Sequence, residues 1–148
     1  MCNLITKDMI VLDLEAKDKQ DTIQKLARLI EKENRLNEFD GFIEQVNIRE
    51  NQFPTSVGFS VAIPHGKTNS VKTAALAFAR LKNEVKWSDE ENTKYIFLIA
   101  VPEEAAGNQH LKILAQISRK IMREEFRNQL EQVSSIDEVL EMLSLEVN

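Results

Sequence analysis

Several residue types are scarce in this chain of 148 residues. It has one cysteine, two histidines, three prolines and four glycines, and aromatic residues make up only 6%. The single cysteine, Cys2, cannot form an internal disulfide bond, which is typical of a protein from a reducing compartment. With no second cysteine and no histidine pair at ligand spacing, a zinc site is not expected. We therefore expect neither a metal nor a cofactor.

Long apolar runs and an excess of basic residues are absent too. The longest apolar stretch, Tyr95–Val101, is much shorter than the ~20 residues of a membrane-spanning helix. The N-terminus has no basic region followed by an apolar core, so we expect no secretory signal and a cytoplasmic location. Acidic residues outnumber basic ones by 24 to 19, which gives a net charge of −5. This charge argues against nucleic acid as a partner.

The apolar patterns that are present predict one α/β domain over residues 1–148. Residues 9–14 alternate well enough for a strand. A one-sided helix is predicted from an N-cap at Asp18 to about Asn34, and a second helix from Glu38. The continuous apolar run at residues 95–101 predicts a central strand covered on both faces. We expect a mixed β-sheet flanked by helices.

The last third of the chain is predicted to be largely helical. One helix has His110 in its first turn and Asn108 as its candidate cap. Ser135 and Glu138 form a capping box that predicts a final helix from Ile136. The inner face of the helix that begins near His110 is predicted to carry Leu111, Leu114, Ala115, Ser118, Ile121 and Met122.

The stretch Pro54–Val71 has two of the four glycines, two of the three prolines and one of the two histidines. It contains Gly-Lys-Thr, the tail of a nucleotide-binding loop. Such a loop needs a glycine five positions before Gly66, where Val61 stands, and Pro64 removes an amide donor that the loop would use. The spacing argues against a nucleotide cradle and leaves either a structural turn or a support for a reactive histidine.

His65 follows Pro64 and precedes Gly66 at the end of an apolar strand. Proline is expected to fix the backbone before the histidine, and glycine to let the chain turn sharply after it. A lone histidine is more often structural or merely exposed. A neutral imidazole held rigidly at a strand end nevertheless suits a nucleophile, and we predict that His65 has this role.

Four further residues could handle a phosphate beside His65. His110 is expected at a helix N-terminus, whose amides and positive dipole end attract anions. Arg49 continues the apolar face of the second helix, so its guanidinium is expected to point inward and to need an anion. Thr55 and Ser56 could add hydroxyl donors. Each of these residues alone is more often structural or solvated, so the hypothesis requires the fold to bring them together.

Two segments resemble the IIA domain of the bacterial sugar phosphotransferase system, of the fructose–mannitol type. They are Ile48–Lys67, "IRENQFPTSVGFSVAIPHGK", and His110–Ser118, "HLKILAQIS". The resemblance runs nearly end to end and includes the Arg-Glu pair after the second helix and the Pro-His-Gly turn. It implies a phosphotransferase component with a mixed sheet flanked by helices.

The resemblance also implies roles for residues and partners. His65 would be phosphorylated by the carrier protein HPr and would pass the phosphoryl group to a cysteine of a IIB domain, with His110 and Arg49 nearby. The membrane component IIC would be involved only indirectly. Family members often read Ser-Thr-Gly where this chain has Pro-Thr-Ser, so it stays open whether Thr55 or Ser56 contacts the phosphate.

Other functions also stay open. A regulatory, nitrogen-related member of the same family would signal by binding proteins according to its phosphorylation state. A hydrolytic enzyme would use a phosphorylated His65 as an intermediate, and a plain binding module would use none. The sequence of residues 54–68, "PTSVGFSVAIPHGKT", most resembles fructose-type members of the family and so favours sugar transport of that type.

Overall fold

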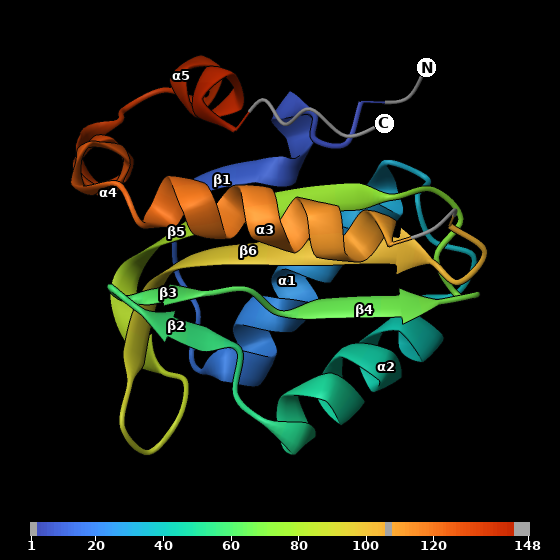
Figure 1. The fold of residues 1–148 in the computed structure, drawn as a ribbon. Helices are drawn as coiled ribbons and strands as arrows, with labels where there is room; N and C mark the ends of the chain where they lie inside the picture. Colours follow the sequence, from blue (N-terminus) through green and yellow to red (C-terminus); the bar gives the residue numbers. More distant parts are fainter. Residues whose placement is uncertain (1–2, 106–107, 144–148) are drawn as a thin grey trace.

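A mixed sheet of six strands lies between two layers of helices (Figure 1). The computed structural model describes residues 3–105 and 108–143, so Cys2 lies outside the described part. The predicted class, an α/β domain with a mixed sheet flanked by helices, is confirmed. Within the described ranges, none of the helices combines the length and the apolar character needed to cross a membrane.

The elements follow one another along the chain with short connections. The strands are β1 (Ile10–Leu14), β2 (Ser56–Gly58), β3 (Val61–Ala62), β4 (His65–Thr68), β5 (Ala75–Lys86) and β6 (Asn92–Pro102). The helices are the 3-10 turn η1 (Lys7–Met9), α1 (Lys19–Lys32), α2 (Phe39–Gln52), α3 (Gln109–Ile121), α4 (Glu124–Gln132) and α5 (Ile136–Met142).

Strand β6 lies inside the sheet and is buried on both faces. It pairs antiparallel with β5 on one side and parallel with both β3 and β4 on the other. Because side chains alternate along a strand, Phe97 and Ile99 pack toward α3, α4 and α5, whereas Ile96 and Leu98 pack toward α1 and α2. The predicted central strand with two covered faces is confirmed.

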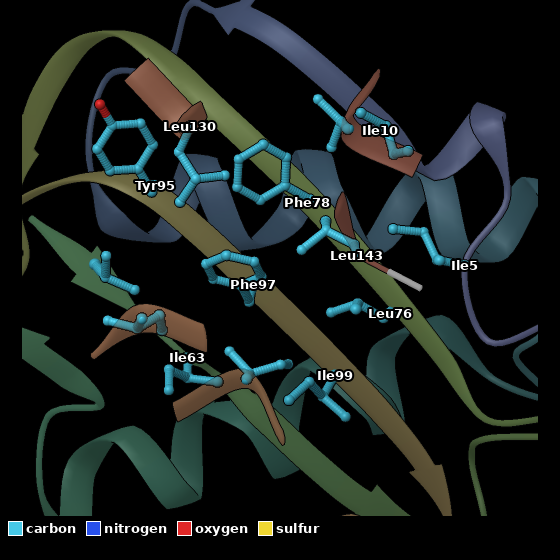
Figure 2. Close-up of a cluster of buried hydrophobic side chains, with 14 of the residues drawn as sticks. Ile5, Ile10, Ile63, Leu76, Phe78, Tyr95, Phe97, Ile99, Leu130 and Leu143 are labelled. Carbon is cyan, nitrogen blue, oxygen red and sulfur yellow. The ribbon is translucent and has the colours of Figure 1, made fainter. Parts of the chain in front are cut away.

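The core on the α3 side anchors the backbone that leads to His65. Figure 2 shows the aromatic rings of Phe78 and Phe97 at the centre of this cluster, with ring centroids 4.9 Å apart. Ile63, between β3 and β4, points into the same cluster and is 4% exposed. The residue two positions before His65 is thus fixed by burial.

Strands β3 and β4 run along the same side of β6 and are interrupted at Pro64; β3 also pairs with β2, whereas β4 pairs with β6 alone. Val61 lies opposite Tyr95 and His65 lies opposite Ile99, so the register along β6 is unchanged across the interruption. Pro64 has no amide hydrogen to donate, so the pairing with β6 is interrupted at this residue. Its carbonyl still accepts a hydrogen bond from the Ile99 amide, at 3.0 Å.

The predicted sharp turn after His65 is wrong, because β4 continues through Gly66 to Thr68. Gly66 has a different role: a Cβ atom at this position would lie 3.1 Å from Val46 Cγ2 and 3.3 Å from Phe42 Cε1. The missing side chain lets α2 pack closely against β4. The glycine in the left-handed region is Gly58, with φ of 88°, at the turn between β2 and β3.

Two of the three predicted helix caps, at Asp18 and Ser135, are confirmed. The side chain of Asp18 accepts a hydrogen bond from the Asp21 amide, and that of Ser135 accepts one from the Glu138 amide. Asn108 occupies the N-cap position of α3, but its side chain makes no capping hydrogen bond.

The predicted inner face of α3 is largely wrong. The buried residues are Ile113, Ile117 and Ile121, whereas Leu111 and Met122 are 52% and 71% exposed. The helix carries two apolar stripes, and its docking on the sheet buries the isoleucine stripe. Of the predicted residues, only Ile121 is fully inside.

Replacing Ile117 with Ala should lower the free energy of unfolding by about 2–5 kcal/mol, because a fully enclosed side chain leaves a cavity. The matched Leu111→Ala change in the same helix should cost less than about 0.5 kcal/mol. Urea unfolding of both variants measures the difference. Equal losses would contradict this docking, and a larger loss for Leu111→Ala would mean that α3 docks with the other face inward.

Candidate functional site

His65 is the first residue of β4 and faces the α3 side of the sheet. Its partner Ile99 and the preceding Ile63 both belong to the core cluster on that side. The half-buried imidazole lies with Nδ1 2.9 Å from the carbonyl oxygen of Ile63. A carbonyl oxygen only accepts, so Nδ1 carries the proton and the lone pair of the neutral ring is on Nε2. Nε2 is therefore the nucleophilic atom.

The pKa of His65 is lowered from its ordinary value. Burial is the largest cause, because it disfavours the charged ring. The hydrogen bond to Ile63 opposes this effect, the nearby Arg49 adds to it, and Glu50 opposes it. The net result is an imidazole that is neutral at neutral pH, as a nucleophile requires.

His110 is the second residue of α3, and the fold brings it to His65. Burial lowers the pKa of His110, and the nearby charges of Lys67 and His65 lower it further. Its Nδ1 atom is buried and has no hydrogen-bond partner among the described residues. The start of α3 therefore presents an imidazole to the same place as β4, together with first-turn amides that have no partner within the helix.

Lys67 is a site residue that the sequence reasoning missed. It follows His65 by two positions in β4, so both side chains lie on the same face of the strand. Its effect on the pKa of His110 places its charge close to the histidine pair. The two-residue spacing of His65 and Lys67 in a strand could have indicated this role. It was overlooked because Gly-Lys-Thr was considered only as part of a nucleotide-binding loop.

Arg49 is close enough to lower the pKa of His65, but its orientation differs from the prediction. It is half-buried in the last turn of α2, and its Nη1 donates to the carbonyl of Phe53 at 2.7 Å. The buried position belongs to Glu50, which is 5% exposed. Glu50 continues the stripe of Phe42 and Val46 at four-residue spacing, and this spacing was the overlooked signal.

Thr55 and Ser56 lie in different surroundings. The buried Thr55 donates its hydroxyl and its amide to the carboxylate of Glu50. Ser56 lines a surface cavity of about 500 Å³, whose other walls include the acidic residues Asp89 and Glu90. Among the contacts of the described residues, none joins either hydroxyl to His65, so their role as phosphate donors stays a prediction.

The set that the fold assembles is suited to accepting an anionic group on a ring nitrogen. Nε2 of His65 offers a lone pair, and His110, Lys67, Arg49 and the first-turn amides of α3 supply polar and positive groups around it. Within residues 3–105 and 108–143, no cluster of three or more histidine, cysteine or acidic side chains could hold a metal ion.

Comparison with protein families gives a match over residues 3–145, to the family described as phosphoenolpyruvate-dependent sugar phosphotransferase system, EIIA 2. The fructose-specific EIIABC component of Bacillus subtilis is 36% identical over 143 residues, which are 95% of this chain and 22% of that protein. The fructose-specific EIIA component of Haloferax volcanii is 32% identical, over 93% of this chain and 90% of its own length. The chain spans only 17–23% of the first curated relatives that it matches.

Two solved structures with the same fold are a nitrogen regulatory protein and a mannitol IIA component. The nitrogen regulatory protein IIA-Ntr from Neisseria meningitidis has a TM-score of 0.85 and 33% identity, with 95% of this chain and 96% of that chain covered. The IIA component in the complex of mannitol enzyme IIA with phosphorylated enzyme IIB from Escherichia coli has a TM-score of 0.80. It covers 95% of this chain and 98% of that chain at 23% identity, which shows the fold alone.

The lowered pKa values of both histidines predict a pH-dependent stability. The unfolded chain binds protons at these residues below about pH 6.5, before the folded protein does. The free energy of unfolding should therefore fall as the pH drops from about 7.5 through about 6.5. Urea unfolding of the His65→Gln, His110→Gln double variant should show a flatter dependence. An unchanged slope in the double variant would contradict the assigned shifts.

Proposed function

The chain belongs to the EIIA 2 family of the phosphoenolpyruvate-dependent sugar phosphotransferase system, and we propose that it carries a phosphoryl group on His65 during uptake of a fructose-type sugar. The observation that carries the proposal is the neutral imidazole of His65, with Nδ1 tied to Ile63 and Nε2 free to attack. The names of the relatives from Bacillus subtilis and Haloferax volcanii favour the fructose type.

In the first step the donor is the phosphorylated carrier protein HPr. The lone pair on Nε2 of His65 attacks the phosphorus in line and forms a P–N bond. The bond between phosphorus and the donor atom breaks, and its electron pair stays with the donor. No proton has to leave Nε2, because the ring proton is on Nδ1 and is held by the Ile63 carbonyl. Such a transfer depends on positioning and charge stabilisation.

Three side chains would stabilise the transferred group. Lys67 and Arg49 bring positive charge to the phosphoryl oxygens, and His110 can donate a hydrogen bond from its imidazole. The first-turn amides of α3, which have no partner within the helix, add donors and the positive end of the helix dipole. The buried Nδ1 of His110, without a partner among the described residues, is consistent with a site completed by an anion.

In the second step a cysteine thiolate of a IIB domain attacks the phosphorus. A P–S bond forms, the P–N bond breaks, and Nε2 of His65 recovers its lone pair. Support for a IIB acceptor comes from the shared fold with the mannitol IIA that is complexed with phosphorylated IIB. Both exchanges would occur in the cytoplasm, and the membrane component IIC would receive the phosphoryl group only through IIB.

Replacing His65 with Ala should abolish phosphoryl uptake from radiolabelled phospho-HPr, because the nucleophile is lost. The His110→Ala variant should still be labelled on His65, but more slowly by roughly 100-fold, because one stabilising group is lost. Rapid-quench labelling followed by mapping of the phosphohistidine measures both effects. Wild-type labelling of the His65→Ala variant would refute the assignment.

A second candidate function is regulatory. The chain is 33% identical to IIA-Ntr of Neisseria meningitidis over nearly the whole of both chains. A regulator on this fold would use the same phosphohistidine to change its affinity for another protein, and would not need to serve a sugar-specific IIB domain.

A transfer assay separates the two candidates. The phosphorylated protein, mixed with purified fructose-type IIB, should lose its label to the IIB cysteine within seconds. A IIB cysteine-to-serine variant should take up none. Label that stays on the protein in the presence of fructose-type and mannitol-type IIB would favour the regulatory function. Steady release of inorganic phosphate without IIB would point to a hydrolase instead.

A further inference from the structure

An ion pair between the buried Glu50 and the partly buried Lys19 lies next to the site and has no place in the transfer chemistry. The Glu50 side chain is 2% exposed, and its Oε2 is 2.8 Å from Nζ of Lys19, the first residue of α1. Nζ of Lys19 also lies 5.1 Å from the centroid of the Trp87 ring and donates to the Trp87 carbonyl at 3.3 Å. Removing a carboxylate from water is costly unless it is paired and hydrogen-bonded.

The other contacts of Glu50 run toward His65. Its two carboxylate oxygens accept the hydroxyl and the amide of Thr55. The carbonyl of Thr55 accepts the amide of Ile63 at 3.0 Å, and the carbonyl of Ile63 accepts Nδ1–H of His65 at 2.9 Å. An unbroken series of hydrogen bonds thus connects the Lys19–Glu50 pair to the imidazole, through the segment on either side of the β2–β3 turn.

We propose that Glu50, neutralised by Lys19, is a positioning residue that fixes the Ile63 carbonyl through Thr55 and so holds His65 in the tautomer with Nε2 free. This inference rests on the proposed function of His65. Among the hydrogen bonds of the described residues, those of Glu50 reach Thr55 and not the ring, so Glu50 acts through the backbone rather than on the phosphoryl group.

Stability alone does not account for a buried carboxylate paired in this way. Buried ion pairs are often no more stabilising than apolar residues of the same size, and their best-attested use is to select one arrangement among several. For His65 the competing arrangements are a rotated ring and the other tautomer. An unanchored Ile63 carbonyl would let the ring rotate or place its proton on Nε2, and either change removes the lone pair from the incoming phosphorus.

Glu50 also has an effect on the pKa of His65 that can be measured. Arg49 and Glu50 act on the ring from the end of α2, whereas His110 on α3 interacts with both His65 and Lys67 of β4. Arg49 lowers the pKa of His65, whereas Glu50 raises it. Neutralising two adjacent residues of one helix should therefore shift the same pKa in opposite directions.

The test uses the full chain labelled with ¹⁵N-histidine. Glu50→Gln keeps the shape of the side chain but removes its charge and one acceptor. In this variant we expect a lower pKa for His65, an increased Nε2–H tautomer, and a kcat for labelling by phospho-HPr that falls about 10- to 100-fold with little change in KM. Glu31→Gln, which removes a surface ion pair with Arg28, is the matched control and should change none of these.

A second pair of variants covers the case in which Glu50→Gln does not fold. Thr55→Val removes the hydroxyl at nearly constant volume, and Thr55→Ser restores it. We expect the Val variant to shift the tautomer and lower kcat, and the Ser variant to recover most of both. Equal tautomers and rates in the two Thr55 variants, or an unchanged His65 in a folded Glu50→Gln protein, would overturn the inference.

The two proposals fail in different ways. If wild-type protein takes no label from phospho-HPr, the carrier function is wrong. The tautomer and the pKa of His65 are measured without any donor, so they still decide whether Glu50 holds the ring. If labelling proceeds normally in wild-type and in Glu50→Gln, the carrier function stands and the positioning role is refuted.

Discussion

The burial of β6 on both faces is the constraint from which the site follows. A strand covered by α3, α4 and α5 on one side and by α1 and α2 on the other can accept a further strand only at its free edge. The chain that pairs there, β3 and then β4, has its alternation fixed by the register along β6. A shift of one residue would move His65 to the α2 face, where Gly66 now lies against Phe42 and Val46.

Opposing effects set the state of the imidazole. Burial and Arg49 disfavour the protonated ring of His65, while Glu50 and the Ile63 carbonyl favour it. A phosphoryl carrier needs such a balance, because the ring must be neutral to attack and must release the group afterwards. The partial exposure of His65 serves the same need, since both donor and acceptor are proposed to be proteins.

Much of the fold could be predicted from the sequence. The caps at Asp18 and Ser135, the doubly buried strand and the mixed α/β class are encoded locally, in caps and in apolar periodicity. The inner face of α3 could not be predicted in this way, because the helix has two apolar stripes and only the sheet decides which is buried. The role of Gly66 was misjudged for a related reason: its neighbours on α2, Phe42 and Val46, precede it by twenty residues or more.

The sequence by itself determined the family resemblance, the identity of the two histidines and the choice of His65 as the nucleophile to test. Only the tertiary structure decided what surrounds that ring: that Lys67 joins it, that Glu50 rather than Arg49 is buried, and that Thr55 is bound to Glu50. The physical reason is that residue type and local spacing specify which groups are available. Charge pairing, hydrogen-bond partners and burial depend on segments that meet only when α1, α2, β4 and α3 pack around the sheet.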